Sequence, residues 1–116
     1  MLKVLIADDE EKICQLIIKL INWEEMGLKI AATASNGIEA LEQAKICKPE
    51  ILITDIRMPG IDGMELIRKV KEKLPDTEII IISGYRHFEY AQTAIRYGVR
   101  NYLLKPIKKE ELRDTL

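Results

Sequence analysis

Acidic, hydroxyl and basic side chains each stand directly after a short apolar run. The residues concerned are Asp8, Asp9, Asp55, Ser83 and Lys105. If the fold brings the three carboxylates together, they repel one another and require a compensating cation. Mg²⁺ suits such a set best, because it takes one or two carboxylates, keeps several waters and binds phosphate oxygens. Lys105 adds a fixed positive charge of the kind that binds a phosphoryl group.

Each of these residues alone also has an ordinary structural interpretation. The run Asp8-Asp9-Glu10-Glu11 is typical of a helix start, where carboxylates suit the positive end of the dipole. Asp55 and Ser83-Gly84 suit turns. Lys105-Pro106 suits an extended or turn dipeptide. The functional interpretation rests on the way these residues occur together. They follow the ends of different predicted strands, and the groups are chemically complementary.

The elements that must position these groups follow from the hydrophobic pattern. Short apolar runs predict strands, and runs with helical spacing between them predict helices. The predicted strands span residues 2–7, 30–34, 51–54, 79–82 and 102–104. The predicted helices span residues 13–22, 38–46, 64–74, 88–97 and 110–116. The segment from Trp23 to Leu28 is predicted to be a connector, with Gly27 ending the preceding helix.

Alternating strands and helices predict an α/β fold with a five-stranded parallel sheet. At this size we expect the doubly wound order 2-1-3-4-5, a flavodoxin-like three-layer sandwich with helices on both faces. In such sheets the site lies outside the carboxyl ends of the strands, where the strand order reverses. The carboxylates, the hydroxyl and the ammonium should therefore meet in one shallow site.

Composition narrows the classes of protein. The 116 residues fit one domain, and a formal net charge of -1 disfavours direct binding of nucleic acid. Cys14 and Cys47 are too few for a disulfide framework, and both are predicted to be small buried hydrophobes in a reducing, cytoplasmic setting. We find no signal peptide and no apolar stretch near the ~20 residues that span a bilayer, so no membrane partner is expected.

The ordered set of motifs resembles the receiver domain of two-component response regulators. The motifs are Asp8-Asp9, Thr54 to Pro59, Asp62-Gly63, Ser83-Gly84 and Tyr102 to Pro106, and the resemblance covers essentially the whole chain. A narrower resemblance, through Trp23, Met26-Gly27 and the segment from Ser83 to Ala91, is to receivers fused to arabinose-regulator-type helix-turn-helix domains.

The resemblance implies a role for each site residue. It implies that Asp55 accepts a phosphoryl group from a histidine kinase, and that Ser83 and Lys105 contact the phosphoryl oxygens. It implies that Asp8, Asp9, Asp55 and the main-chain carbonyl of Arg57 hold Mg²⁺, for which Mn²⁺ can substitute. Such a domain is not a dedicated enzyme, but it catalyses its own phosphorylation and dephosphorylation.

The resemblance also implies a switch and its partners. Tyr102 falls at an aromatic position that turns inward as Ser83 moves, and Arg57 and Tyr85 fall at positions that tune the phosphate lifetime. His87 is assigned no role in phosphotransfer. Phosphorylation is expected to alter the surface of the last two helices and the last strand, and to favour a homodimer. The short last helix predicts that residues 1–116 are a receiver excised from a longer regulator, in which an effector domain absent here binds DNA.

Three alternatives remain to be separated. A flavin-binding electron carrier shares the architecture, but it would need a hydroxyl- and glycine-rich loop where Asp8-Asp9 stands. An aspartyl-phosphate hydrolase would need an acid two residues after its nucleophile, where this chain has Arg57. The third alternative is a stand-alone or degenerate receiver that acts only as a protein-docking module. A degenerate receiver is disfavoured because every site position is filled.

Overall fold

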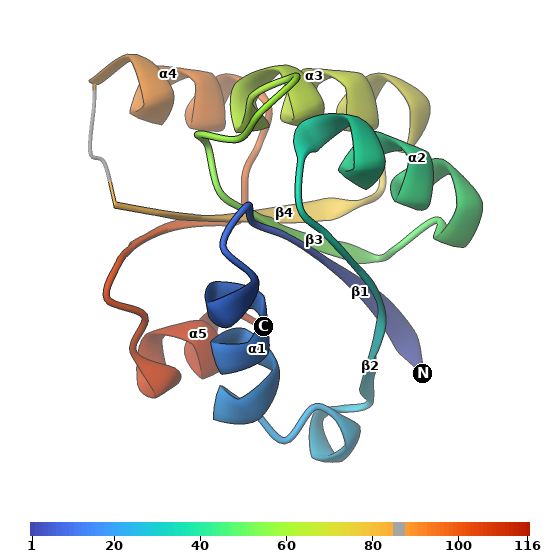
Figure 1. Cartoon of the computed structure of the whole chain (residues 1–116), viewed down its shortest axis with the longest axis vertical. Helices are drawn as coiled ribbons and strands as arrows, with labels where there is room; N and C mark the ends of the chain where they lie inside the picture. The colour runs from blue at the N-terminus through green and yellow to red at the C-terminus, as the bar shows by residue number, and fades with distance from the viewer. Residues whose placement is uncertain (85–87) are drawn as a thin grey trace.

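The structure is a computed structural model that describes residues 1–84 and 88–116, with the backbone alone at Phe88 (Figure 1). The elements in chain order are β1 (Leu2–Ala7), α1 (Glu11–Leu20), the 3-10 helix η1 (Glu24–Met26), β2 (Leu28–Ala34), α2 (Gly37–Cys47), β3 (Ile51–Thr54), α3 (Gly63–Lys73), β4 (Glu78–Ser83), α4 (Phe88–Arg96), β5 (Asn101–Leu104) and α5 (Lys109–Thr115). The predicted alternation of strands and helices is confirmed. Among the described residues, no helix is both long and apolar enough to cross a lipid bilayer.

The strands form one parallel sheet in the order β2-β1-β3-β4-β5, which confirms the predicted topology. In the register, Ala7 lies opposite Thr54, and Thr54 lies opposite Ile81. The residues that follow β1 and β3 therefore leave the sheet side by side. This register brings Asp8 and Asp55 to the same edge.

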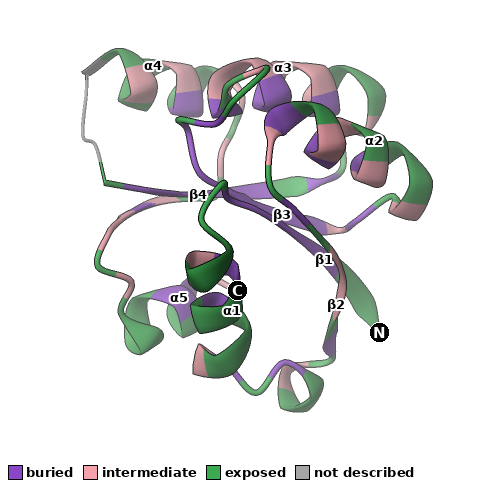
Figure 2. Cartoon of the chain, in the orientation of Figure 1, coloured by how far each residue is buried: buried purple, intermediate pink, exposed green. Residues whose placement is uncertain are grey.

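Apolar side chains fill both faces of the sheet, so the molecule has three layers (Figure 1). On one face, α2, α3 and α4 cover alternate strand residues, among them Leu5, Leu52, Ile79 and Ile81. On the other face, α1 and α5 cover the intervening residues, among them Ile6, Ile53, Ile80 and Ile82. Figure 2 shows the central strands as buried, as expected for parallel strands that helices cover on both sides.

The segment between α1 and β2 differs from the prediction. Helix α1 ends at Leu20, and the predicted connector contains the short helix η1, which Gly27 ends. Trp23 is 7% exposed, and its indole Nε1 donates to the main-chain oxygen of Ile18 at 3.0 Å. Trp23 thus packs against the end of α1 and satisfies its one polar atom there.

The two cysteines occupy different environments. Both thiols are free, but Cys14 is buried whereas Cys47 is only half-buried, so the prediction of burial is wrong for Cys47. Burial raises the pKa of both thiols, and that of Cys14 rises to about 11. Cys14 therefore stays protonated at neutral pH, and its Sγ lies 3.8 Å from the main-chain oxygen of Asp8, to which it donates.

Gly63 allows the start of α3 to lie directly against the main chain that follows β3. Its N–H donates to the carbonyl oxygen of Ile56 at 2.6 Å. A Cβ on Gly63 would overlap the carbonyl oxygen of Asp55 and lie 2.7 Å from the Cα of Ile56. Because both obstructing groups are main chain, they cannot rotate away as a side chain could.

Replacing Gly63 with Ala should destabilise the domain by about 1–3 kcal/mol, the usual range for overpacking a tight site. Urea or thermal unfolding followed by circular dichroism measures the change. Gly84→Ala serves as the matched control, because a Cβ on Gly84 would meet no atom of the described residues within 4 Å. Equal stability of the two variants would contradict the assigned close approach at Gly63.

Candidate functional site

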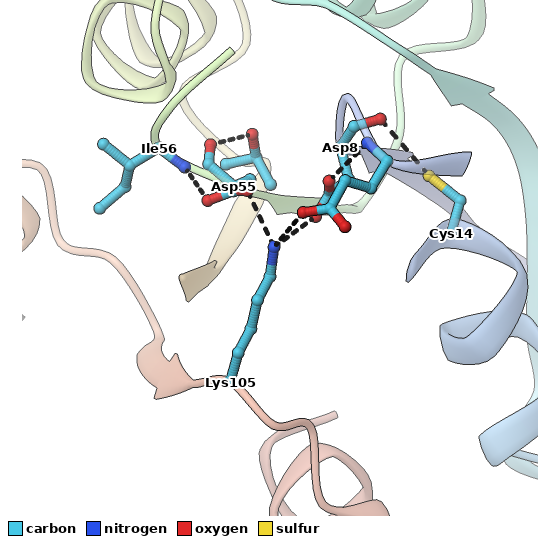
Figure 3. Close-up of polar contacts among 7 residues, drawn as sticks. Asp8, Cys14, Asp55, Ile56 and Lys105 are labelled. Carbon is cyan, nitrogen blue, oxygen red and sulfur yellow. Dashed lines mark hydrogen bonds and ion pairs between the residues drawn. The ribbon is translucent and has the colours of Figure 1, made fainter. Parts of the chain in front are cut away.

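Three charged side chains converge at the carboxyl edge of the sheet (Figure 3). Asp8 follows β1, Asp55 follows β3 and Lys105 follows β5. The sheet hydrogen bonding continues past the strand ends, since the Asp55 N–H donates to Ala7 and the Asp8 N–H donates to Ala34, each at 3.0 Å. The main chain at both aspartates is therefore as firmly held as the sheet itself.

The ammonium of Lys105 joins the two buried carboxylates. Its Nζ lies 3.0 Å from Oδ2 of Asp55 and 3.1 Å from Oδ2 of Asp8. Asp8 is 2% exposed and Asp55 is 6% exposed, so neither carboxylate is well solvated. A buried charge is tolerated only when it is paired and hydrogen-bonded, and Lys105 provides both.

The Asp55 carboxylate also has a fixed orientation. Its Oδ1 accepts from the N–H of Ile56 at 2.7 Å, while its Oδ2 faces Lys105. The hydroxyl of Thr54 donates to the main-chain oxygen of Asp55 at 2.8 Å. These contacts hold both the side chain and the main chain of Asp55 in one position.

The ionisation of the site reflects burial and charge together. Burial raises the pKa of the Asp8 carboxyl and the charge of Asp55 raises it further, against the opposing effects of the Glu10 N–H and Lys105. Burial acts to lower the pKa of Lys105, but hydrogen bonds and attraction to Asp55 and Asp8 outweigh it, so this pKa is raised. The ammonium is thus firmly charged, while the carboxylates still bear uncompensated repulsion.

Among the described residues at this edge of the sheet, carboxylates outnumber cationic groups. One carboxylate oxygen from each of Asp8, Asp9 and Glu10 lies within 4.8 Å of the others. Asp9 is exposed, so its carboxylate is open to solvent. Hard oxygen donors of this kind, together with Asp55 next to Asp8, fit Mg²⁺.

Glu10 is a site residue that the sequence analysis did not single out. It occupies the N-cap position of α1 but makes no side-chain capping hydrogen bond. Its carboxylate instead lies 4.0 Å from Nζ of Lys105. The sequence predicts Glu10 as part of a helix start, and a side chain in that role gives no signal that it also approaches Lys105.

The remaining predicted residues lie at or near the same edge. Ser83 ends β4, is fully buried and accepts the Lys105 N–H at its main-chain oxygen at 2.8 Å. Arg57 is exposed in the segment between β3 and α3. Tyr102 is half-buried in β5, opposite Ile81, and packs against the core beneath α4. Tyr85 and His87 lie outside the described residues.

Comparison with known proteins agrees with this geometry. The family model described as "Response regulator receiver domain" matches residues 4–116. The uncharacterized transcriptional regulatory protein YesN of Bacillus subtilis is 44% identical over 116 residues, which are 100% of this chain and 32% of that protein. The transcriptional regulatory protein HptR of Staphylococcus aureus is 39% identical, over 100% of this chain and 45% of its own length.

A solved structure shows the same relationship. The REC domain of AraT, a response regulator from Geobacillus stearothermophilus, superposes with a TM-score of 0.91 at 45% identity, over 97% of this chain and 88% of that one. The narrower resemblance, to receivers fused to arabinose-regulator-type domains, is consistent with these relatives.

The match extends over nearly the whole chain, and it coincides with the predicted motifs and with the observed strand order. The chain spans 32% of the length of the Bacillus subtilis protein and 45% of that of the Staphylococcus aureus protein. Proteins of this family are phosphorylation-dependent switches of two-component systems, and receiver domains generally bind Mg²⁺ at an acidic pocket. The chain belongs to the response regulator receiver domain family.

Proposed function

We propose that Asp55 accepts a phosphoryl group from a histidine kinase and so switches this receiver between two states. The main support is the position of the Lys105 ammonium, 3.0 Å from Asp55 and 3.1 Å from Asp8 in a buried setting. A phosphoryl group on Asp55 would place its oxygens beside this cation. Lys105 would then offset their charge as well as that of the carboxylates.

Asp8, Asp9, Asp55 and the main-chain carbonyl of Arg57 would hold Mg²⁺, and Mn²⁺ could substitute for it. The cluster of carboxylate oxygens from Asp8, Asp9 and Glu10 supports this assignment, and Asp55 adjoins Asp8 through the ammonium of Lys105 that both contact. When bound, Mg²⁺ offsets negative charge on the phosphoryl oxygens. Glu10 adds further negative potential at the edge of the site.

The transfer itself requires little more than positioning. The attacking group is a carboxylate oxygen, which carries no proton for a general base to remove. One of its oxygens forms a bond to phosphorus, and the bond from phosphorus to the donor nitrogen breaks with its electron pair returning to the imidazole. The product is a mixed anhydride on Asp55. Lys105 and the Ser83 hydroxyl bind the transferred oxygens.

The switch would run through Ser83 and Tyr102. The N–H of Lys105 donates to the main-chain oxygen of Ser83 at 2.8 Å. In the same ladder, Tyr102 lies opposite Ile81, two residues before Ser83. Tyr102 is one of the residues that line a pocket of ≈ 460 Å³ between α4 and β5, together with Ala94 and Ile95. This pocket offers a second location for the ring when Ser83 moves.

The proposed output is a change in the surface formed by α4, β5 and α5. On that surface Ile95 is 81% exposed, which suits a face that gains an apolar partner. We propose that two copies of the chain associate through this surface when Asp55 is phosphorylated. Residues 1–116 would act as the receiver of a longer cytoplasmic regulator that contacts DNA only through a separate effector domain.

Asp55→Asn should abolish specific phosphorylation, because the neutral amide lacks the anionic oxygen that attacks phosphorus. Incubation with acetyl phosphate and Mg²⁺, followed by intact-mass analysis, measures one added phosphoryl group in the wild type and none in the variant. Asp76→Asn is the control, since Asp76 is exposed in the turn before β4. Unchanged labelling of the Asp55→Asn variant would exclude the proposed acceptor, and no labelling of the wild type would favour a docking module.

Mg²⁺ should stabilise the domain, because a ligand of the native state raises the free energy of unfolding, by about 2.7 kcal/mol at a hundred times Kd. Asp9→Ala should remove most of this gain, whereas Asp76→Ala should retain it. Thermal unfolding across a Mg²⁺ titration measures the response. A wild-type melting temperature that does not change with Mg²⁺ would show that the carboxylates do not form a metal site.

Beryllofluoride, a mimic of the phosphoryl group, should change the side-chain conformation of Tyr102. Aromatic NMR signals of Tyr102 with and without the mimic measure this change. The Trp23 indole N–H is the internal control, because it is held by Ile18 at the opposite end of α1 from the site. Identical Tyr102 signals in both states would contradict the relay without affecting the assignment of Asp55.

A further inference from the structure

The first turn of α2 lies directly against the loop that joins β3 to α3. Gly37 is the first residue of α2, and a Cβ there would overlap the carbonyl oxygen of Ile61. The same Cβ would lie 2.5 Å from Cγ1 and 2.9 Å from the carbonyl carbon of Ile61. The Gly37 N–H donates to the carbonyl oxygen of Pro59 at 3.5 Å. The absence of a side chain at Gly37 is therefore what allows the two segments to approach.

This turn of α2 is itself firmly held. The side chain of Asn36 caps the helix by accepting from the N–H of Glu39 at 2.8 Å, and the Glu39 carboxylate accepts from the N–H of Ser35 at 3.3 Å. Ile38 covers the loop from the same turn, because a Cβ on Gly60 would lie 3.1 Å from its Cδ1. The start of α2 thus forms a rigid support for residues 59–61.

The loop is held at two points on either side of Arg57. Before Arg57, the carbonyl of Ile56 accepts from the N–H of Gly63 at 2.6 Å. After it, Pro59 and Ile61 rest on Gly37. These two attachments, together with the burial of Met58 in the core, constrain the path of the main chain at Arg57, and the second of them comes from another part of the fold.

We propose that Gly37 is a positioning residue for the metal site, acting through the loop on the main-chain carbonyl of Arg57. This inference rests on the proposed function, in which that carbonyl binds Mg²⁺. A side chain at position 37 would push Pro59 and Ile61 away from α2. The Arg57 carbonyl would then move relative to Asp8 and Asp55, which the sheet holds in place.

The test is Mg²⁺ binding to the whole chain by isothermal titration calorimetry. Gly37→Ala should weaken Mg²⁺ affinity about tenfold or more, the usual effect of losing a group that orients a metal ligand. At saturating Mg²⁺, its rate of phosphorylation by acetyl phosphate should recover toward the wild-type rate. A purely structural role would not separate affinity from rate in this way.

Two further variants keep the test decisive. Ala44→Gly weakens the same helix at a buried position far from its first turn, and it should leave Mg²⁺ affinity unchanged. Ile38→Ala removes the contact over Gly60 at a side chain that is 53% exposed, so the variant should fold. It should weaken Mg²⁺ binding in the same direction as Gly37→Ala, but less.

Wild-type affinity in a folded Gly37→Ala variant would overturn the inference, as would an equal loss of affinity in Ala44→Gly. If Gly37→Ala does not fold, Ile38→Ala decides, and unchanged Mg²⁺ binding by that variant overturns the inference. Absence of Mg²⁺ binding by the wild type is a different result, because it would reject the metal site of the proposed function itself.

Discussion

The ion pairs of Lys105 with Asp8 and Asp55 constrain the rest of this structure. Two carboxylates that are almost fully buried are costly unless a cation neutralises them, and one lysine does not neutralise two. Among the described residues, the remaining negative charge gives this edge of the sheet a potential that attracts cations. The arrangement is possible only because three parallel strands end at the same edge.

The central strands of the sheet consist mainly of buried apolar side chains. Four consecutive isoleucines in β4 are each no more than 1% exposed, and they alternate between the two cores. Moving such a strand by one residue would exchange its two faces, so the register is strongly specified. The buried, regularly paired strands are a fixed support for the charged groups on the loops that follow them.

The sequence predicted the features that depend on local pattern and chain order. Apolar runs located the strands, the alternation with helices indicated the topology, and Asp8, Asp55 and Lys105 followed as the residues after strand ends. It did not predict η1, the partial exposure of Cys47, the position of Glu10 or the contact between Gly37 and Ile61. These features depend on how distant segments approach one another, for which hydrophobic periodicity provides no signal.

The alternation of side chains along β5 has a consequence for how a signal could spread. Tyr102 packs into the core beneath α2, α3 and α4, whereas the next residue, Leu103, packs into the core beneath α1 and α5. The sheet lies between these two cores, so their side chains do not contact each other directly. A change in the Tyr102 side chain would therefore alter contacts with α2, α3 and α4 directly. It would affect α1 and α5 only through a shift of the β5 backbone.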